Sequence, residues 1–286
     1  MEVVIQSHTS ATVNTKLILN NSPPRLTISI VTYLPDQSSL TATLESLKNA
    51  MSRLHNPSIS TWIIDNSPPH HQPKWLYNLS KEYSVSLIHG HGNIGFGRGH
   101  NLILAKTGDF HLILNPDVEL AEDALTTALE FMDKHTECGL VTPFVSWPDG
   151  SQQFLCKRFP TLFDLFLRGF APGCVQSWFQ ERLNNYEMRD AIGSTIYWDP
   201  PIASGCCMLF RNDVLQRLSG FDPGFFLYFE DFDISLRTSQ ISRIVYFPDM
   251  KIIHHGGHAA RKGWHHIFMF IRSATAFFNK HGWRLA

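Results

Sequence analysis

The chain has 286 residues, of which 43% are hydrophobic and 17% are charged, so it can form one large α/β domain or two small ones. A formal net charge of −1 excludes the strongly basic surface typical of nucleic-acid-binding domains, and we expect no nucleic-acid partner. Five cysteines without a CxxC pair argue against a disulfide framework and favour reduced thiols in a cytoplasmic protein.

The first 25 residues differ in composition from the rest of the chain. They are rich in Thr, Asn and Ser, end near Pro23 and Pro24, and lack the basic start and continuous apolar stretch of a secretory signal. No apolar run approaches the roughly 18 residues that a membrane span needs. We therefore expect a poorly ordered leader over 1–25 and one folded domain over 26–286.

In the first half of the chain, short apolar runs alternate with amphipathic ones. We predict strands, in chain order, over 26–33 (LTISIVTY), 61–65 (TWIID), 85–89 (VSLIH) and 110–115 (FHLILN). Leucines at helical spacing predict a helix that begins after an N-cap at Ser38 or Ser39. Further helices are predicted, in chain order, near 75–83, from about Asn101, and over 121–135.

Strands that alternate with helices predict a mostly parallel sheet with helices on both faces. In such sheets, ligands bind beyond the carboxyl ends of the strands. Here those ends are 32–33, 65–66, the glycine-rich stretch 90–101, and 115–117. The pattern therefore predicts the position of a binding site without reference to any motif.

The second half has a different pattern. Residues 157–190 contain KRFPTLFDLFLRGF and scattered aromatic residues, without strand alternation. A strand is predicted within 201–210 (PIASGCCMLF), and one or two more are predicted within 243–258, where the run ends in histidines. Between them, 220–237 is aromatic with an acidic cluster.

Asp65, at the end of the second predicted strand, is a candidate base-reading residue. An ionised carboxylate only accepts hydrogen bonds, so it suits the N3–H donor of a uracil or thymine ring. The alternative is an ordinary turn aspartate in the sequence DNSPP, and on this residue alone that alternative is favoured.

The glycine-rich stretch 90–101 is a candidate nucleotide loop. Glycines let the backbone approach a phosphate, and a following helix N-terminus favours negative charge. The spacing G-x-G-x-G after the third strand is not a dinucleotide fingerprint, and a surface loop remains the alternative.

Asp117, in the sequence LILNPDVEL, is a candidate metal ligand at the edge of the sheet. Mg²⁺ takes oxygen ligands and needs only one or two carboxylates together with substrate phosphates and waters. A turn aspartate after proline is the alternative. His254, His255 and His258 are candidate loop ligands, although a structural or surface histidine is the favoured interpretation of the last two.

The cluster Glu230, Asp231 and Asp233 follows an aromatic run. Neighbouring like charges and apolar surroundings raise carboxyl pKa values, which suits a general base. A solvated helix start, with its acids near the positive end of the helix dipole, is the alternative. The density of acids and aromatics favours the catalytic interpretation.

Taken in order, these segments resemble the family-two glycosyltransferases of the GT-A fold, and within them bacterial rhamnosyltransferases of cell-surface polysaccharides. The similarity extends over about residues 26–272. The segments that carry it are ISIVTY, IIDNSPP, GNIGFGRGHN, LILNPDVEL, KRFPTLFDLF, ASGCCMLFRNDV, GFDPGFFLYFEDFDISLR and IIHHGG. The resemblance implies an α/β fold with a Rossmann-like, doubly wound mixed sheet, a nucleotide-binding half over 26–118 and an acceptor and catalytic half over 119–286.

The resemblance also implies residue roles. In the nucleotide site it implies Thr32, Asp65, Asn66, Gly95, Phe96, Gly97, Asn101 and Asn115. It implies Asp231 as the catalytic base with Glu230 beside it, and Asp117 with His254 as ligands of a divalent cofactor, Mg²⁺ or Mn²⁺. For the acceptor it implies Ser204, Gly205, Lys157 and Arg158. The wider superfamily has Asp-x-Asp where this chain has Asn115-Pro116-Asp117, so one metal-binding carboxylate is missing.

The reaction implied is inverting transfer of a sugar, with L-rhamnose from dTDP-rhamnose as the expected donor. UDP-galactofuranose or UDP-N-acetylglucosamine is the alternative donor. The expected acceptor is a saccharide, free or linked to a polyprenyl pyrophosphate. A non-catalytic sugar-nucleotide or glycan-binding module and a metal-dependent hydrolase are the competing functions.

Residues 157–185 are the candidate acceptor and membrane-facing segment. Its basic residues Lys157, Arg158 and Arg168 suit a lipid pyrophosphate, and its apolar residues suit the membrane interface. We therefore expect peripheral contact with the cytoplasmic face of the inner membrane. A helix packed on the core is the alternative.

Overall fold

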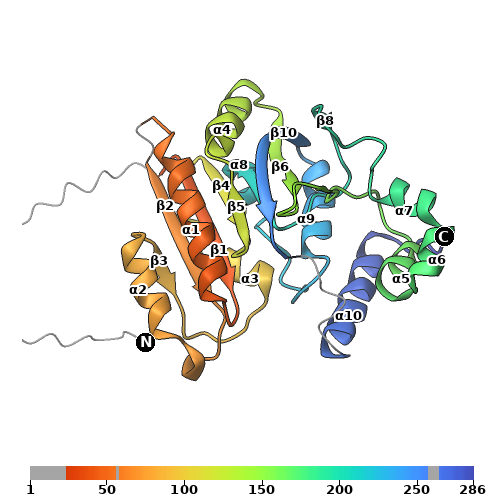
Figure 1. The fold of residues 1–286 in the computed structure, drawn as a ribbon, viewed down its shortest axis with the longest axis horizontal. Helices are drawn as coiled ribbons and strands as arrows, with labels where there is room; N and C mark the ends of the chain where they lie inside the picture. Colours follow the sequence, from red (N-terminus) through yellow and green to blue (C-terminus); the bar gives the residue numbers. More distant parts are fainter. Residues whose placement is uncertain (1–23, 56–57, 257–263) are drawn as a thin grey trace, which may run out of the picture.

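A mixed sheet forms the centre of the protein, with helices on both of its faces (Figure 1). The computed structural model describes residues 24–55, 58–256 and 264–286. The expected leader over 1–25 lies outside the described residues except for Pro24 and Arg25, and His258 lies outside them as well.

The strands lie across the sheet in the order β3-β2-β1-β4-β9-β6-β10-β5. Strands β1 to β4 are parallel neighbours, β9 runs antiparallel to β4 and β6, β10 runs parallel to β6, and β5 runs antiparallel to β10. The bounds are β1 Leu26–Thr32, β2 Ile59–Asp65, β3 Ser86–Ile88, β4 Phe110–Leu114, β5 Val118–Leu120, β6 Cys138–Ser146, β7 Gln152–Gln153, β8 Tyr197–Trp198, β9 Cys207–Arg211 and β10 Arg243–His254. The mixed sheet agrees with the family resemblance, whereas strand–helix alternation alone predicts a mostly parallel one.

The helices fall into three groups. Helices α1, α2 and α4 cover one face of the sheet, α3, α8 and α9 cover the other, and α5, α6, α7 and α10 lie together at one end of the molecule (Figure 1). The bounds are α1 Gln37–Ser52, α2 Lys74–Glu82, α3 Phe96–Asn101, α4 Ala124–Lys134, α5 Leu162–Phe170, α6 Gly173–Trp178, α7 Gln180–Tyr186, α8 Asn212–Arg217, α9 Glu230–Ser239 and α10 Trp264–His281, with 3-10 turns at Pro69–His71 and Leu104–Lys106.

The apolar pattern of the strands accounts for this layering. Every residue of β1 and β4 is buried, because both strands lie in the middle of the sheet with helices on either side. Leu26, Ile28 and Ile30 belong to the core beneath α1, α2 and α4. Ile113, from β4, belongs to the core on the opposite face with Phe221 and Ile234.

Helix α1 begins one turn earlier than the serine caps predict. Its N-cap is Asp36, whose Oδ1 accepts a hydrogen bond from the Ser39 backbone N–H at 2.9 Å and from the Ser38 hydroxyl at 2.5 Å. An aspartate caps a helix as well as a serine does. The two serines lie in the first turn and donate to this cap.

Helix α3 corrects the prediction of a long loop followed by a helix from Asn101. The helix begins at Phe96, inside the glycine-rich stretch, and Asn101 is its last residue. Two glycines permit this because they allow close packing: a Cβ on Gly97 would lie 2.6 Å from the Phe221 Cβ, and one on Gly99 would lie 2.8 Å from Val31 Cγ2. Glycine content therefore reflects tight packing here as well as loop structure.

A buried pair of histidines lies behind α3. The Ser29 hydroxyl lies 2.6 Å from His100 Nδ1 and 2.9 Å from His111 Nε2. Burial lowers the pKa of His111 to about 3 and holds the pKa of His100 well below its ordinary value. Both rings are therefore neutral in the folded protein.

These histidines predict a loss of stability in acid. His111 has a folded pKa below its unfolded value near 6.5, so the unfolded chain binds more protons and stability falls as pH drops below about 6.5. By pH 5, His111 alone should cost about 2 kcal/mol of unfolding free energy. Urea unfolding measures the free energy of unfolding at pH 7 and at pH 5. The decrease between the two pH values should be smaller by this amount in His111→Gln than in the wild type. His55 is exposed, so His55→Gln is the control. The same decrease in His111→Gln as in the wild type would contradict the account.

Candidate active site

The carboxyl ends of β1, β2 and β4 meet at one edge of the sheet, where the register pairs Thr32 with Asp65. The Thr32 hydroxyl donates to Asp65 Oδ1 at 3.0 Å, and the Ser67 hydroxyl donates to the same oxygen at 2.7 Å. Asp65 Oδ2 accepts a longer bond of 3.3 Å from the Gln72 side-chain amide. The carboxylate is buried and held in one orientation, as a preorganised acceptor requires.

Asn66 connects this strand end to the glycine-rich stretch. Its Nδ2 donates to the Gly95 carbonyl at 3.0 Å, and its Oδ1 lies 2.9 Å from His91 Nε2. Gly95 has a φ of 92°, and a Cβ there would lie 2.3 Å from the Phe226 carbonyl oxygen, so both its conformation and its surroundings require glycine. The next residue, Phe96, donates its N–H to that same carbonyl at 3.1 Å.

Asn101 and Gly97, two of the residues implied for the nucleotide site, contact Phe221 in the structure. The Asn101 amide donates to the Phe221 carbonyl at 2.7 Å and accepts from the Phe221 N–H at 2.9 Å. Gly97 packs against the same phenylalanine. Both residues therefore hold the loop 220–229 against α3, within the glycine-rich stretch 90–101.

Asp117 and His254 lie together, although 136 residues separate them in the sequence. His254 Nε2 is 3.5 Å from Asp117 Oδ1, and the His255 backbone N–H donates to the Asp117 carbonyl at 3.0 Å. The antiparallel pairing of β10 with β5 produces this contact. A Cβ on Gly256 would lie 2.2 Å from Asp117 Oδ2, so the chain passes directly over the carboxylate.

Gln153 determines which nitrogen of His254 faces the aspartate. Its side-chain N–H donates to the His254 carbonyl at 2.7 Å, which leaves its Oε1 as the acceptor for His254 Nδ1–H at 3.2 Å. The other ring nitrogen, Nε2, therefore faces Asp117. Two electron-pair donors that converge in this way fit a divalent cation, and the amide orients the histidine as outer-shell partners commonly do. No motif in the sequence indicates Gln153.

Within the described ranges, no cluster of three or more His, Cys, Asp or Glu side chains is placed to hold a metal. A cation at Asp117 and His254 would therefore need further ligands from phosphates and waters, as Mg²⁺ commonly does. His255 points elsewhere, because its Nε2 lies 2.6 Å from Glu119 Oε1. It is a surface histidine, as favoured from the sequence.

The acids Glu230 and Asp231 form the first turn of α9, directly after two residues with unusual backbone angles. Tyr228 and Phe229 have φ values of 71° and 64°, in the left-handed region that aromatic residues seldom adopt. Such strain persists only where the surroundings enforce it, and it often occurs at functional sites. Here it turns the chain so that both acids point inward.

Asp231 is held by two backbone donors. Its Oδ2 accepts from the Gly205 N–H and its Oδ1 from the Phe232 N–H, both at 3.0 Å. Burial raises its pKa above the ordinary range. Burial, together with the charge of Asp231, raises the pKa of Glu230 to about 8, and Glu230 Oε2 is buried without a hydrogen-bond partner among the described residues. Glu230 is therefore mostly protonated near neutral pH.

A cavity of about 450 Å³ opens beside these acids. Its polar lining includes Ser204, Lys157 and Arg168 as well as the two acids, and its apolar lining comes mainly from α5, α10 and the 228–232 segment. Asp117 and His254 are not among the lining residues. The cavity is therefore lined by the candidate catalytic acids and by candidate acceptor residues.

The two acids proposed from the sequence nevertheless lie near a common point. The Asn115 N–H donates to the Cys206 carbonyl at 2.9 Å, and the adjacent Gly205 donates to Asp231. Burial raises the pKa of the Cys206 thiol to about 12, and the negative charges of Asp117 and Asp231 both add to this rise. The Asn115–Asp117 segment and Asp231 therefore both contact the few residues that lead into β9.

Gly205 also lies between Asp231 and the glycine-rich stretch 90–101. A Cβ on Gly205 would lie 3.2 Å from the Asp231 Cβ and 3.4 Å from Phe96 Cε1. The ring of Phe96 and the Asp231 carboxylate are thus close neighbours across this one glycine. A larger residue at 205 would push them apart.

The other candidate acceptor residues differ in their surroundings. Lys157 is buried, and burial followed by the nearby Arg168 lowers its pKa to about 7. It lies 3.5 Å from Glu187, which also pairs with Arg168 at 2.5 Å. Arg158 pairs with both oxygens of Asp190 at about 3 Å and does not line the cavity. The geometry therefore favours Lys157 and Arg168 over Arg158.

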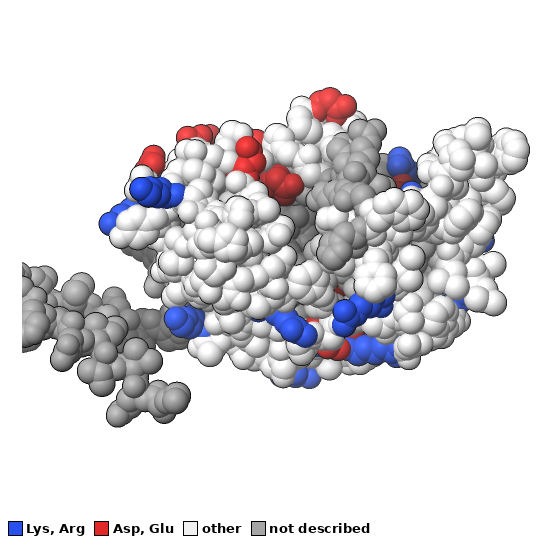
Figure 2. Space-filling model, turned by 90° about the horizontal axis from the view of Figure 1, so that it is seen from below, with Lys and Arg blue, Asp and Glu red and all other residues white. Residues whose placement is uncertain are grey.

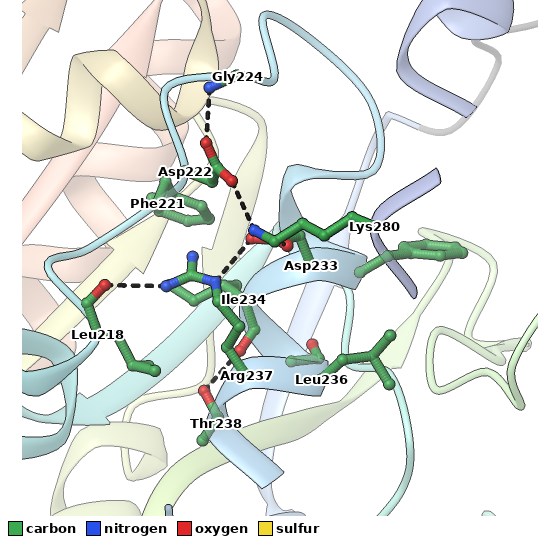
Figure 3. A network of polar contacts seen from close by, with 12 residues as sticks. Leu218, Phe221, Asp222, Gly224, Asp233, Ile234, Leu236, Arg237, Thr238 and Lys280 are labelled. Atoms are coloured by element: carbon green, nitrogen blue, oxygen red, sulfur yellow. Dashed lines mark hydrogen bonds and ion pairs between the residues drawn. The ribbon is translucent and has the colours of Figure 1, made fainter. Parts of the chain in front are cut away.

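The third acid of the cluster has a structural task (Figure 3). Asp233 is fully buried and contacts three basic side chains: Arg237 at 2.8 Å, Lys280 at 2.7 Å and His281 at 2.8 Å. The last two belong to α10. Asp233 therefore fastens the C-terminal helix to the helix that carries the candidate catalytic acids.

Comparison with known proteins agrees with this geometry. The family model for glycosyl transferase family 2 matches residues 27–219. The chain is 26% identical over 253 residues to an N-acetylglucosaminyl-diphospho-decaprenol L-rhamnosyltransferase of Mycobacterium tuberculosis. The aligned region covers 82% of this chain and 77% of that protein. It is 27% identical over 196 residues to rhamnosyltransferase WbbL of Escherichia coli, which covers 64% of this chain and 69% of that protein.

Solved structures show the same GT-A fold. GalNAc-T7, solved with UDP, GalNAc and Mn²⁺, has a TM-score of 0.59 at 16% identity, and the similarity covers 83% of this chain and 45% of that one. The mannosyltransferase PcManGT of Pyrobaculum calidifontis, solved with GDP-Man and Mn²⁺, has a TM-score of 0.54 at 18% identity, over 91% and 64% of the two chains. The chain thus spans less than two thirds of each of these two proteins. Because the family model covers most of the chain, the protein belongs to glycosyl transferase family 2 and is a glycosyltransferase.

Proposed function

We propose that the protein is an inverting rhamnosyltransferase that uses Asp231 as its base, dTDP-rhamnose as donor, and a saccharide acceptor, free or linked to a polyprenyl pyrophosphate. The observation that carries the proposal is the position of Asp231. Its carboxylate lines the cavity, has a raised pKa, and is oriented by Gly205, which also contacts the nucleotide loop at Phe96. The similarity to rhamnosyltransferases supports the choice of sugar.

The proposed step is a single displacement. An acceptor hydroxyl in the cavity gives its proton to Asp231 as its oxygen forms a bond to the anomeric carbon of the donor. The bond between that carbon and the diphosphate oxygen breaks, and the nucleoside diphosphate leaves with the electron pair. The transition state resembles an oxocarbenium ion, as in other glycosyl transfers.

In this proposal the half over 26–118 binds the nucleotide. Asp65 would accept the N3–H of a thymine or uracil ring, with Thr32 and Asn66 beside it and Gly95 and Phe96 lining the nucleotide. The support is that these side chains or backbone groups meet at one edge of the sheet. Asn115 would lie between this half and the catalytic half, because it is hydrogen-bonded to the start of β9.

Asp117 and His254 would hold a divalent cation, Mg²⁺ or Mn²⁺, on the donor diphosphate. When bound, such a cation stabilises negative charge on a leaving diphosphate. The support is the convergence of the carboxylate and the Nε2 nitrogen at 3.5 Å. The asparagine at position 115 replaces a second carboxylate, so the site relies on phosphate and water ligands.

In the catalytic half, 119–286, Ser204, Lys157 and Arg168 would face the acceptor. Lys157 and Arg168 bring two cations to the same cavity as Asp231, which suits the diphosphate of a lipid-linked saccharide. Bound diphosphate would favour the charged form of Lys157, whose pKa of about 7 leaves it only partly charged at neutral pH.

A panel of nucleotide sugars tests the proposal. With Mg²⁺ or Mn²⁺ and an acceptor, dTDP-rhamnose should release dTDP faster than the other donors, and chelation of the metal should reduce the rate. A preference for UDP-galactofuranose or UDP-N-acetylglucosamine would overturn the sugar. Binding without turnover would indicate a binding module, and equal release without acceptor would indicate a hydrolase.

A further inference from the structure

One face of α10 is apolar and exposed. Trp264, Phe268 and Ile271 follow one another at helical spacing of four and three residues, and they are 86%, 66% and 54% exposed. Farther along the same helix, Phe277 and Phe278 are buried against α5 and the 225–232 segment. Packing within the protein therefore explains only part of the apolar surface of this helix.

Helix α5 adds a second exposed stripe beside the first. Phe166 and Phe170, four residues apart, are 53% and 47% exposed. The ring of Phe170 lies 6.4 Å from that of Phe270 on α10, in an edge-to-face arrangement. The two helices lie next to each other at the end of the molecule remote from α2 (Figure 1). Figure 2 views the protein from below. The right-hand part of that face, at the same end of the molecule, is mostly without charged side chains.

This apolar surface continues into the catalytic cavity. Phe170, Ile267 and Phe270 line the cavity that holds Glu230 and Asp231. Part of the cavity wall and the exposed stripes therefore come from the same two helices. An acceptor with an apolar tail and a polar head would have its tail at the surface when its head is near the acids.

Basic side chains accompany the apolar ones. Arg168, on α5, lines the cavity and is partly exposed, and Arg272, on α10, is exposed next to Ile271. Exposed aromatics with neighbouring cations are typical of helices that lie in the interface of an anionic bilayer. Tryptophan in particular prefers the level of the lipid headgroups. No helix among the described residues is long and apolar enough to cross a membrane.

We propose that Trp264, Phe268 and Ile271 of α10, together with Phe166 and Phe170 of α5, dock onto the surface of an anionic lipid bilayer. The cavity then opens toward the membrane, from which a lipid-linked acceptor enters beside Arg168 and Lys157. This inference rests on the proposed function, from which it takes the lipid-linked saccharide as the class of acceptor. It assigns the principal contact to α10, which lies outside the segment 157–185 that the sequence suggests.

Vesicle co-sedimentation of the full chain tests this surface. The protein should bind vesicles of mixed phosphatidylglycerol and phosphatidylcholine, and bind less to phosphatidylcholine alone. The triple variant Trp264→Ser, Phe268→Ser, Ile271→Ser should lose about tenfold or more in the bound-to-free ratio, since each lost apolar group weakens interfacial binding. These three residues do not line the cavity, so transfer to a short water-soluble acceptor should remain within about twofold of wild type.

The matched control replaces Tyr77, Leu102 and Ile196 with serine, because these side chains are also large, apolar and exposed but lie elsewhere. It should bind vesicles as wild type does. The proposal is overturned if wild type stays in the supernatant, if the α10 variant binds equally well, or if ultracentrifugation shows a wild-type dimer that the variant abolishes. Vesicle binding is measured without donor, so a failed transfer assay with intact vesicle binding would count against the proposed function alone.

Discussion

Replacing Asp231 with asparagine should reduce turnover by about 100-fold to 10,000-fold, the range that a positioned general base contributes. Asparagine keeps the size of the side chain, and its oxygen can still accept a backbone N–H from Gly205 or Phe232, so the fold should survive. Donor binding should also persist, because the nucleotide-binding residues lie on other elements. Steady-state kinetics would measure the loss of turnover, and calorimetric titration with the nucleoside diphosphate of the donor would measure binding.

Glu230→Gln is the matched control for this experiment. With a pKa of about 8, Glu230 is mostly protonated at neutral pH, and glutamine resembles that neutral form. Turnover at pH 7 should therefore fall by less than about tenfold. In the wild type, kcat/KM should decline as pH falls through the raised pKa of Asp231, since the base must be ionised. Near-normal turnover by Asp231→Asn, or a larger loss in Glu230→Gln, would contradict the assignment.

Replacing Asp233 with asparagine should lower the free energy of unfolding by about 3 kcal/mol, because it leaves the largely buried Arg237 guanidinium without its counter-charge. Asp233 has no solvent exposure, while the side chains of its partners Arg237, His281 and Lys280 are 17%, 11% and 36% exposed. Urea unfolding, followed by circular dichroism at neutral pH, would measure the loss. Helix α10 should also become less protected from hydrogen exchange, since two of the three partners lie on it.

Asp222 provides the control within the same network (Figure 3). It also pairs with Lys280, at 2.5 Å, but its side chain is about a third exposed and it accepts a further bond from the Gly224 N–H. Asp222→Asn should therefore cost about 1 kcal/mol or less, as partly exposed ion pairs usually do. Equal effects for the two substitutions would contradict the structural task assigned to Asp233.

The alternation of strands and helices predicts much of the structure over 26–118. Strand ends such as Thr32, Asp65 and Asn115 are visible because each apolar run stops at a turn signal. The rule for ligands at carboxyl ends then brings these residues together before any contact is known. The glycine-rich stretch is harder, because glycine marks a loop and also marks a helix that packs closely on its neighbours.

Strand β6 illustrates what local patterns miss. It contains Pro143, and a proline within an apolar run usually argues against a central strand. Here Pro143 pairs with Phe247 at the point where a bulge shifts the register of β10, so the missing N–H is tolerated. The position of that bulge depends on a partner about 100 residues away. Local sequence contains no information about it.

The candidate site was predictable in its acids but not in their supports. Glu230, Asp231 and Asp233 look alike in the sequence, and only the contacts with Lys280 and His281 of α10 distinguish the structural acid from the other two. Gln153 fixes the tautomer of His254 from a two-residue strand that carries no motif. Roles of this kind depend on contacts between distant segments, which periodicity and spacing do not describe.

The anomeric configuration of the product tests the central claim most directly. We predict that the protein transfers rhamnose from β-linked dTDP-rhamnose to an acceptor hydroxyl with inversion, so that nuclear magnetic resonance of the product shows an α-linked sugar. Inversion is the outcome of one displacement assisted by one base at Asp231. A β-linked product, or rhamnose released to water at the same rate without acceptor, would contradict this mechanism.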